Sequence, residues 1–245
     1  MEIEEVVKGV FQVSAVRVGW QLIVGDDAVT LVDAGWRKDY ATIAASLQAV
    51  GHSLASIEAL ILTHAHVDHM GCAAELARNH DTRVLGHREE SELARGMRHE
   101  GITTLELLKK SYRPSVLMFG LDALRRGGNS VDRLDHLETF ESGVALDVPG
   151  SPIALHTPGH TSGSSCYHLP DRGVLITGDA LATSNIYTGT QTCQLMPSEF
   201  NHDQQQAIES LDTIRDVRAD VVLSGHGQPF RGSPAQAVEE ALGLL

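Results

Sequence analysis

The chain has few cysteines and few basic residues. Its three cysteines, Cys72, Cys166 and Cys193, form no C-x-x-C pair and no plausible disulfide framework, which is typical of a reducing compartment. The 19 Lys and Arg residues are outnumbered by 32 Asp and Glu residues, so the formal net charge is −13. No block of basic residues offers an electrostatic footprint for nucleic acid or for an anionic membrane surface. These absences favour a small-molecule substrate.

Long apolar runs are also absent. None approaches the roughly 20 residues that are needed to span a bilayer. The acidic first segment, residues 1–13, has neither the basic region nor the apolar region of a secretory signal. We therefore expect a cytoplasmic protein without membrane contact. No repeat of short fixed period and no low-complexity tract occurs along the 245 residues.

The first third of the chain predicts strands followed by α/β alternation. Three short strands joined by tight turns are expected between residues 9 and 35. Periodicity then predicts helices at 37–50, 71–79 and 88–97 and strands at 58–62 and 82–86. Regular alternation of helices and strands is the signature of an α/β fold.

The last part of the chain repeats this order. Five short strands are expected near 137–140, 144–148, 152–156, 164–168 and 173–177. They are followed by a predicted helix at 203–216, a strand at 220–224 and a helix at 234–243. Two similar halves of this kind predict two sheets packed face to face with helices outside, within one domain covering residues 1–245.

Residues 98–133 depart from the alternation. Their apolar residues recur at helical spacing, but Pro114 and the pair Gly127 and Gly128 interrupt them, so an inserted helical segment is predicted. As a lid over a functional site it would supply an apolar wall, with Met118 and Phe119 suited to an acyl chain. As an alternative it would form the surface of a homodimer, and the two roles are compatible.

The stretch LTHAHVDHMG, residues 62–71, contains three histidines and an aspartate within six positions. It follows an apolar, β-branched run that predicts a buried strand, and it precedes a predicted helix start. The side chains are therefore expected in a strand-to-helix turn at the edge of a sheet. They are His64, His66, Asp68 and His69.

Three more ligand-type residues follow later predicted strands. They are His160 in HTPGHTSGS, Asp179 in VLITGDAL and His226 in VVLSGHGQP, and neighbouring glycines let the backbone approach a shared centre. Imidazole and carboxylate suit zinc, manganese or iron, whereas the scarcity of thiolates argues against a structural cysteine-rich zinc site. Seven ligands are too many for one tetrahedral ion, so two divalent ions sharing Asp179 are expected.

These motifs resemble those of the metallo-β-lactamase superfamily. THAHVDHMG, GHTSGS, TGD and SGHG occur in the family's order over nearly the whole chain. The resemblance implies a four-layer αββα sandwich of two mixed sheets, with the metals at one sheet edge. It also implies the ligand sets, with Asp179 as the bridge: His64, His66 and His160 for one metal, and Asp68, His69 and His226 for the other.

The resemblance extends to residues around the ligands. TLVDAG at 30–35 resembles the family's early aspartate motif, which implies that Asp33 lies behind the first histidines and orients a ligand imidazole. Tyr187 would donate a hydrogen bond to a developing oxyanion, as a tyrosine does in some lactonases that the chain resembles, or would form a pocket wall. Cys72 and His156 are expected to pack structurally.

The sequence favours a dinuclear metal hydrolase acting on a small ester, lactone or thioester. Zinc is expected, although iron or manganese would fit the same ligands. A metal-bridging hydroxide would be the nucleophile, because divalent ions lower the pKa of bound water to about 7 in the best case, and Asp68 would guide a proton to the leaving group. The alternatives are a mononuclear iron persulfide dioxygenase using His64, His160 and Asp179, a β-lactam hydrolase and a noncatalytic ligand-binding member.

Overall fold

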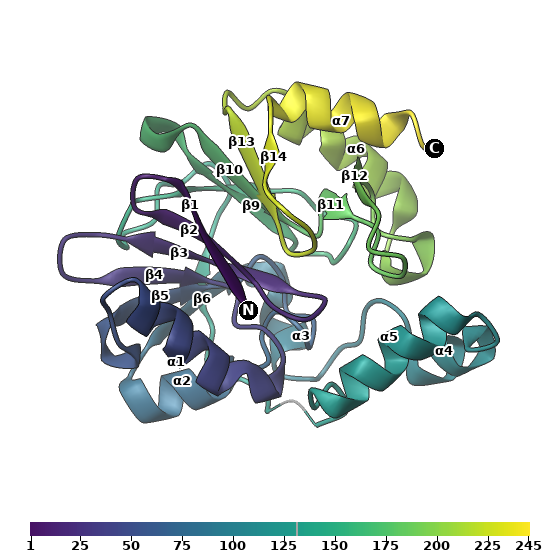
Figure 1. Ribbon diagram of the computed structural model, residues 1–245, viewed down its shortest axis with the longest axis horizontal. Helices are drawn as coiled ribbons and strands as arrows, with labels where there is room; N and C mark the ends of the chain where they lie inside the picture. The colour runs from purple at the N-terminus through teal and green to yellow at the C-terminus, as the bar shows by residue number, and fades with distance from the viewer. Residues whose placement is uncertain (131) are drawn as a thin grey trace.

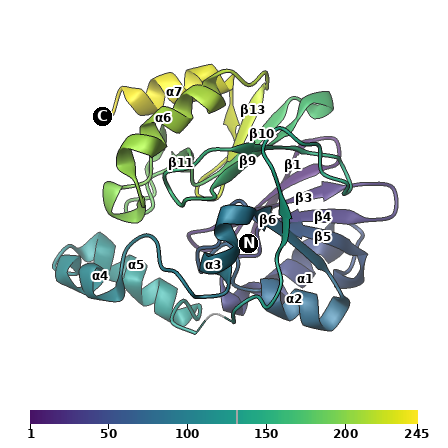
Figure 2. The same cartoon turned by 180° about the vertical axis from the view of Figure 1, so that it is seen from behind.

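The chain folds into four layers in a computed structural model that describes residues 1–130 and 132–245. A seven-stranded sheet and a five-stranded sheet pack face to face (Figure 1). Helices α1 (Tyr40–Ala49) and α2 (Ala73–His80) cover the outside of the first sheet, and α6 (Gln204–Arg215) and α7 (Pro234–Leu242) cover the second, as the view from behind in Figure 2 also shows. The predicted αββα sandwich is confirmed.

The first sheet has the strand order β1 to β7. Its strands β1 to β4 pair antiparallel, and β4 to β7 pair parallel. The strands are β1 (Glu2–Val7), β2 (Val10–Ser14), β3 (Gly19–Val24), β4 (Val29–Val32), β5 (Ile57–Ile61), β6 (Arg83–His87) and β7 (Glu138–Phe140). The sequence did not predict β1, because this edge strand is acidic and Val6 alone among its six residues is buried.

The second sheet has the strand order β14-β13-β10-β9-β8. Only β10 and β13 pair parallel; the other neighbours are antiparallel. The strands are β8 (Ile153–His156), β9 (Ser165–Leu169), β10 (Val174–Gly178), β13 (Val221–Ser224) and β14 (Phe230–Arg231), and a separate antiparallel pair is formed by β11 (Ala182–Ser184) and β12 (Gln191–Gln194). The short strands β11, β12 and β14 were not predicted.

Two predicted elements are wrong or too long. The strand expected at 144–148 is a single bridge between Ala145 and Ile153, because the segment leads directly into the turn at Pro149 and Gly150. The helix expected at 88–97 is one 3-10 turn followed by α3 (Ser91–Ala94), which ends in a turn at Gly96, where φ is +71°.

Three apolar clusters hold the layers together. One lies between the first sheet and its helices, a second between the two sheets, and a third between the second sheet and α6 and α7. Strand β5 shows the alternation, because Leu60 belongs to the first cluster whereas Ala59 and Ile61 belong to the second. Each fully buried Leu or Ile contributes roughly 1.5–3 kcal/mol relative to exposure, so this packing fixes the strand ends rigidly.

The predicted insertion is a helical hairpin between β6 and β7. Helices α4 (Thr104–Lys110) and α5 (Pro114–Arg125) stand away from the sandwich (Figure 1). Val116 and Phe119 of α5 are buried, whereas the opposite side of the hairpin is exposed. Residue 131, which falls within the predicted insertion, lies outside the described residues. The lid and dimer roles stay predictions. Among the described helices none is long and apolar enough to cross a membrane.

Candidate metal centre

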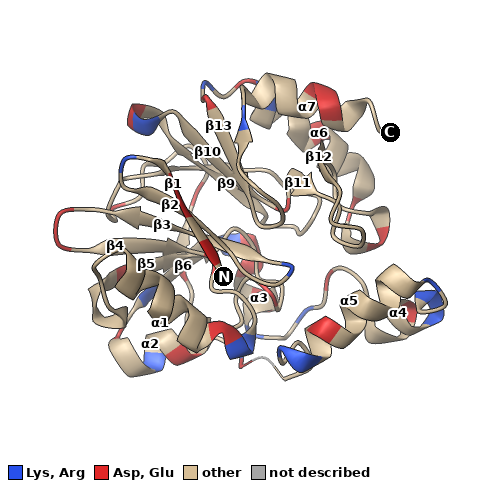
Figure 3. Ribbon diagram, in the orientation of Figure 1, with Lys and Arg blue, Asp and Glu red and all other residues tan. Residues whose placement is uncertain are grey.

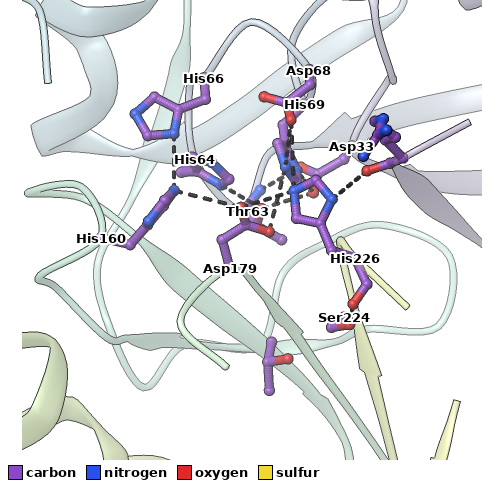
Figure 4. A network of polar contacts seen from close by, with 12 residues as sticks. Asp33, Thr63, His64, His66, Asp68, His69, His160, Asp179, Ser224 and His226 are labelled. Carbon is purple, nitrogen blue, oxygen red and sulfur yellow. Dashed lines mark hydrogen bonds and ion pairs between the residues drawn. The ribbon is translucent and has the colours of Figure 1, made fainter. Parts of the chain in front are cut away.

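All seven predicted ligands meet at one edge of the sandwich. The ends of β4, β5, β10 and β13 and the loop after β8 open at this edge, because parallel strands share their direction. The side chains point toward one another from these separate loops, as Figure 4 shows. They form a first group, His64, His66 and His160, and a second group, Asp68, His69 and His226, while a further set, His64, His69 and Asp179, overlaps both; within each set the ligand atoms lie within 4.8 Å of one another.

The first group contains three histidines from two loops. The Nε2 atom of His160 lies 2.9 Å from Nδ1 of His66. The His64 ring stands edge-on to both of these rings, with centroid distances of 4.6 Å in each case. Three imidazole nitrogens therefore converge from the turn after β5 and the loop after β8.

The second group combines a carboxylate with two histidines. The Oδ2 atom of Asp68 lies 3.9 Å from Nε2 of His69 and 3.6 Å from Nε2 of His226. Ligand atoms bound about 2.1 Å from a tetrahedral ion lie about 3.4 Å apart. The spacing in this group is therefore close to that of a metal site.

Asp179 lies between the two groups. Its Oδ2 atom is 3.6 Å from Nε2 of His160 in the first group and 3.1 Å from Nε2 of His226 in the second. Its Oδ1 atom is 3.5 Å from Nε2 of His69. One carboxylate thus faces ligand atoms of both groups, which is the placement that a bridging ligand requires.

The second ring nitrogen of each histidine contacts a polar group of the protein. Such contacts fix the tautomer and the orientation of a ligand imidazole. Four of these contacts are His66 Nε2 with the Glu100 carbonyl (3.1 Å), His160 Nδ1 with Asn201 Oδ1 (3.0 Å), His64 Nδ1 with Thr63 Oγ1 (3.0 Å) and His226 Nδ1 with the Arg17 carbonyl.

Asp33 provides the fifth contact. Its Oδ2 atom lies 2.7 Å from Nδ1 of His69 and accepts a hydrogen bond from Thr63 Oγ1 at 2.8 Å. Its Oδ1 atom accepts the backbone N–H of Thr63 at 2.8 Å. The predicted placement of Asp33 behind the histidines is confirmed, and the carboxylate holds both a ligand ring and the turn that carries the ligands.

Burial and neighbouring charges move the pKa values of the cluster in opposite directions. Burial, together with the adjacent imidazoles, holds the pKa of His64 and His66 well below the usual value. Burial also lowers the pKa of His69, but Asp179, Asp33 and Asp68 outweigh it and raise the pKa well above the usual value. Burial raises the pKa of Asp179, but His226 and His69 outweigh it and hold that pKa well below its usual range. The buried carboxylates therefore need positive charge beside them.

Unpartnered atoms show that the cluster fits divalent ions. Among the described residues, His64 Nε2, His69 Nε2, His226 Nε2 and Asp179 Oδ1 are buried side-chain atoms with no well-oriented hydrogen-bond partner. Burying such atoms without a partner is costly. Neutral imidazole and carboxylate donors at this spacing suit zinc, manganese or iron, and an ion would satisfy both the orphaned atoms and the excess of carboxylates.

Glycines allow the loops to approach the cluster, as the sequence predicted. A Cβ atom on Gly225 would lie 2.4 Å from Cε1 of His69 and 2.6 Å from Oδ1 of Asp179. At Gly178, where φ is +52°, it would lie 2.5 Å from Oγ1 of Thr63. Both positions therefore require glycine for steric reasons.

Several residues around the cluster were missed by sequence reasoning. Glu90 is fully buried and accepts hydrogen bonds from the Ala65 N–H (2.7 Å), Thr161 Oγ1 (2.6 Å) and the Gly163 N–H (2.8 Å), so it joins the two ligand loops. Its position soon after a predicted strand end was the only available signal. Asn201 and Arg17 carried no sequence signal, since they approach from loops distant in sequence.

Three other predicted residues lie outside the cluster. The Tyr187 hydroxyl donates to Oε1 of Glu199 at 3.2 Å, and its ring packs against Phe119, so the oxyanion role stays a prediction. Cys72 is buried, and burial raises the pKa of its thiol. His156 stacks on His87 with a centroid distance of 4.0 Å. The packing expected for Cys72 and His156 is confirmed.

Known proteins are similar to this chain in sequence. The chain is 27% identical over 215 residues to the probable metallo-hydrolase YflN of Bacillus subtilis (strain 168), which covers 82% of this chain and 76% of that protein. It is 25% identical over 221 residues to the atrochrysone carboxyl ACP thioesterase of Passalora fulva, which covers 88% of this chain and 50% of that protein.

A solved structure and a family model agree with these relatives. The metallo-beta-lactamase family protein TTHA1429 from Thermus thermophilus has a TM-score of 0.67 and 25% identity, covering 96% of this chain and 78% of that one. The model of the metallo-beta-lactamase superfamily matches residues 10–226, which include all seven clustered His and Asp residues. The chain therefore belongs to the metallo-beta-lactamase superfamily.

Proposed function

We propose that the protein is a dinuclear metal-dependent hydrolase that cleaves a small ester, lactone or thioester. The observation that carries this proposal is the position of Asp179 between two groups of ligand atoms. His64, His66 and His160 would hold one ion, Asp68, His69 and His226 would hold the other, and Asp179 would contact both. The complete second group favours this hydrolase over a mononuclear iron dioxygenase, which would need only His64, His160 and Asp179.

The bound ions would supply Lewis acidity and activated water at neutral pH. The protein's own part is orientation and proton handling. Asp33 and the other outer contacts hold the imidazoles in one tautomer, so that neutral nitrogens face the centre. The Asp68 carboxylate stands at the cluster with its side chain 11% exposed, more than the side chains of His69, Asp179 and His226. We assign it the transfer of a proton toward the leaving group.

Thioesters are the substrate class that we place first. The support is a relative whose name specifies a carrier-protein thioesterase, although the match covers only half of that protein. The apolar cluster beside the insertion contains Phe119, Met196 and Phe200. Asn201, the residue after Phe200, contacts His160, so the segment that carries this cluster also reaches the centre. An acyl chain would pack against this wall.

The test is a hydrolysis panel on protein purified without a histidine tag. Small thioesters, lactones, esters and a β-lactam would be assayed with and without oxygen, after chelation and after return of zinc, manganese or iron. The proposal predicts oxygen-independent cleavage that is lost on chelation and restored by metal. Oxygen consumption on a persulfide with a single iron per chain, or no metal-dependent turnover on any ester-type substrate, would overturn it.

Tyr187 is the proposed oxyanion donor. Its hydroxyl is engaged with Glu199, which also pairs with Lys110 at 2.8 Å, so donation to a substrate would need this contact to open. A lost oxyanion donor lowers kcat by about 100-fold or more, and Tyr187→Phe should show this with unchanged metal content. A change in kcat below about twofold would show that the Tyr187 ring forms only a wall of the pocket. Glu199→Gln is the matched control, because it alters the same hydrogen bond and keeps the tyrosine hydroxyl.

A further inference from the structure

Arg17 connects parts of the molecule that are far apart in sequence. It lies in the turn between β2 and β3, whose end reaches toward α5 in Figure 1. Its backbone has a φ of +64°, a conformation that residues with a Cβ atom rarely adopt. Such a conformation persists only where surrounding contacts determine it. The contacts of Arg17 show what determines it.

The backbone of Arg17 contacts the metal centre. Its carbonyl oxygen accepts a hydrogen bond from Nδ1 of His226. The neighbouring Gly19 N–H donates to the carbonyl of Gly225 at 2.8 Å, so the turn is bonded to the His226 loop at two points. Because Nδ1 carries the proton, Nε2 of His226 is left free to face Asp68 and Asp179.

The side chain of Arg17 contacts the insertion and a second loop. Its Nε atom donates to Oδ2 of Asp122 on α5 at 2.6 Å, and one terminal N–H donates to the carbonyl of Ile186 at 3.1 Å. The guanidinium carbon lies 5.9 Å from the centre of the Phe119 ring, also on α5. The two charged side chains are only 20% and 25% exposed, so the ion pair is partly shielded from solvent.

These contacts form one continuous connection. It runs from α5 through the Asp122 carboxylate and the Arg17 guanidinium to the Arg17 carbonyl, and from there to the imidazole of His226. Arg125 also approaches Asp122, at 3.6 Å, but its side chain is 75% exposed. Arg125 therefore contacts the same carboxylate but does not connect it to the metal centre.

We propose that Arg17 is a positioning residue that ties the α4–α5 hairpin to the metal centre and sets the orientation of His226. This assignment rests on the proposed function for the role of His226 as a metal ligand. The hairpin is also attached through the buried side chains of Val116 and Phe119 and through the ion pairs of Lys110 with Glu199 and Arg126 with Asp39. The Arg17 contacts are expected to carry part of this attachment, and movement of the hairpin would reach His226 through the same residue.

The experiment compares Arg17→Ala, Arg17→Gly and Arg17→Lys with the control Arg125→Ala. Glycine keeps access to the positive φ without the side chain, and lysine keeps the charge without the two-pronged donor geometry. Chelated protein of each variant would be titrated with cobalt(II), whose absorption spectrum reports each occupied site, and the hairpin would be probed by limited proteolysis.

We expect Arg17→Ala and Arg17→Gly to lower the cobalt affinity of one of the two sites by about tenfold. Only the absorption spectrum of that site should change. The same variants should be cleaved faster within residues 98–133, Arg17→Lys should fall between them and the wild type, and Arg125→Ala should match the wild type. Wild-type affinity, spectrum and cleavage in Arg17→Gly would overturn the proposal.

The outcome separates this proposal from the proposed function. If the wild type binds two cobalt ions and the Arg17 variants behave like it, the positioning role fails and the dinuclear site stands. If the wild type binds one ion or none, the dinuclear site fails, and the link to His226 as a ligand fails with it. Unchanged proteolysis in the Arg17 variants would then also contradict the role of Arg17 in attaching the hairpin.

Discussion

The metal centre and the α4–α5 hairpin differ in how their side chains are held. In the centre, His64, His69 and Asp179 are almost fully buried, and each histidine ring has one nitrogen fixed by a neighbour. On the hairpin, apolar side chains such as Leu108 and Met118 are about 60% exposed, at 62% and 58%. The centre is determined by contacts from several loops, whereas the outer face of the hairpin is determined mainly by its own helices.

Charge separates the two regions as well. Residues 98–133 contain seven Lys and Arg and four Asp and Glu, a balance of +3, whereas the whole chain has −13. Lys and Arg lie at both ends of the hairpin in Figure 3. A region that needs several loops to form tolerates little change, and an exposed helical region tolerates much. Substitutions in the two regions should therefore differ in both kind and size of effect.

The largest effect is expected from Asp179→Ala. Removing the carboxylate that faces both ligand groups should lower metal content and turnover together, by more than the 10- to 100-fold that loss of an outer contact produces. Elemental analysis and an assay on the same preparation would measure this. Asp212→Ala, at a side chain that is 76% exposed, is the matched control. Wild-type metal content and wild-type turnover in Asp179→Ala would contradict the assignment of Asp179 as a bridging ligand.

A smaller loss is expected from Gly225→Ala. The added Cβ would lie 2.4 Å from Cε1 of His69, so the ring must shift, and metal affinity should fall about 10- to 100-fold. Gly243→Ala, where the nearest atom would be 3.4 Å away, should leave affinity unchanged. Competition with a chromogenic chelator measures both variants, and equal affinities would contradict the steric account.

Glu90→Gln should change how stability depends on pH. Burial raises the pKa of Glu90 to about 7, against 4.5 for the exposed group. Between these values the folded state holds a proton that the unfolded state has lost, so the free energy of unfolding falls as pH rises through this window. The total fall is about 3 kcal/mol, from 1.36 kcal/mol per pKa unit.

Glutamine at position 90 cannot ionise, so the free energy of unfolding of the variant should lack this fall with rising pH. Denaturant unfolding of chelated protein between pH 4.5 and 8 would give the free energy of unfolding of both proteins. The wild-type value minus the variant value should decrease with rising pH. A difference that stays constant, or that increases with pH, would show that Glu90 is ionised throughout in the folded protein.

The smallest effect on stability is expected on the hairpin. Leu124→Gln alters a side chain that is 54% exposed, so the free energy of unfolding should change by less than about 0.5 kcal/mol. If the hairpin forms a homodimer surface, one of the two roles expected from the sequence, sedimentation should show a wild-type dimer that this substitution dissociates. Val144→Gln, at an exposed residue elsewhere, is the control. A wild-type monomer, or equal sedimentation of all three proteins, would exclude this surface.

The sequence predicted the elements that carry strong local signals. The motif around His64 and the strand ends at Asp179 and His226 were readable, because an apolar run followed by Gly and a ligand-type residue is a local pattern. The same periodicity predicted the helices of the sandwich and the insertion. Strands β1 and β14 were missed because pairing with a neighbour, and not their own composition, makes them strands.

Contacts between distant loops could not be predicted. Arg17 approaches His226 across 209 positions in sequence, and Glu90 joins Ala65 to Thr161 and Gly163. Arg17 has no neighbouring pattern that distinguishes it from a surface residue, and Glu90 has only its position soon after a predicted strand end. Their roles depend on the packing of the two sheets, which brings the loops to one edge and is determined by the whole core.

The most direct test of the proposed dinuclear centre is the number of metal ions bound per chain. Protein without a histidine tag would be stripped with a chelator, titrated with zinc by calorimetry, and checked by elemental analysis after dialysis. The account predicts about two ions per chain in the wild type and fewer in Asp179→Ala. A single ion per wild-type chain, or binding that Asp179→Ala leaves unchanged, would contradict the assignment of Asp179 as a ligand shared by two metal sites.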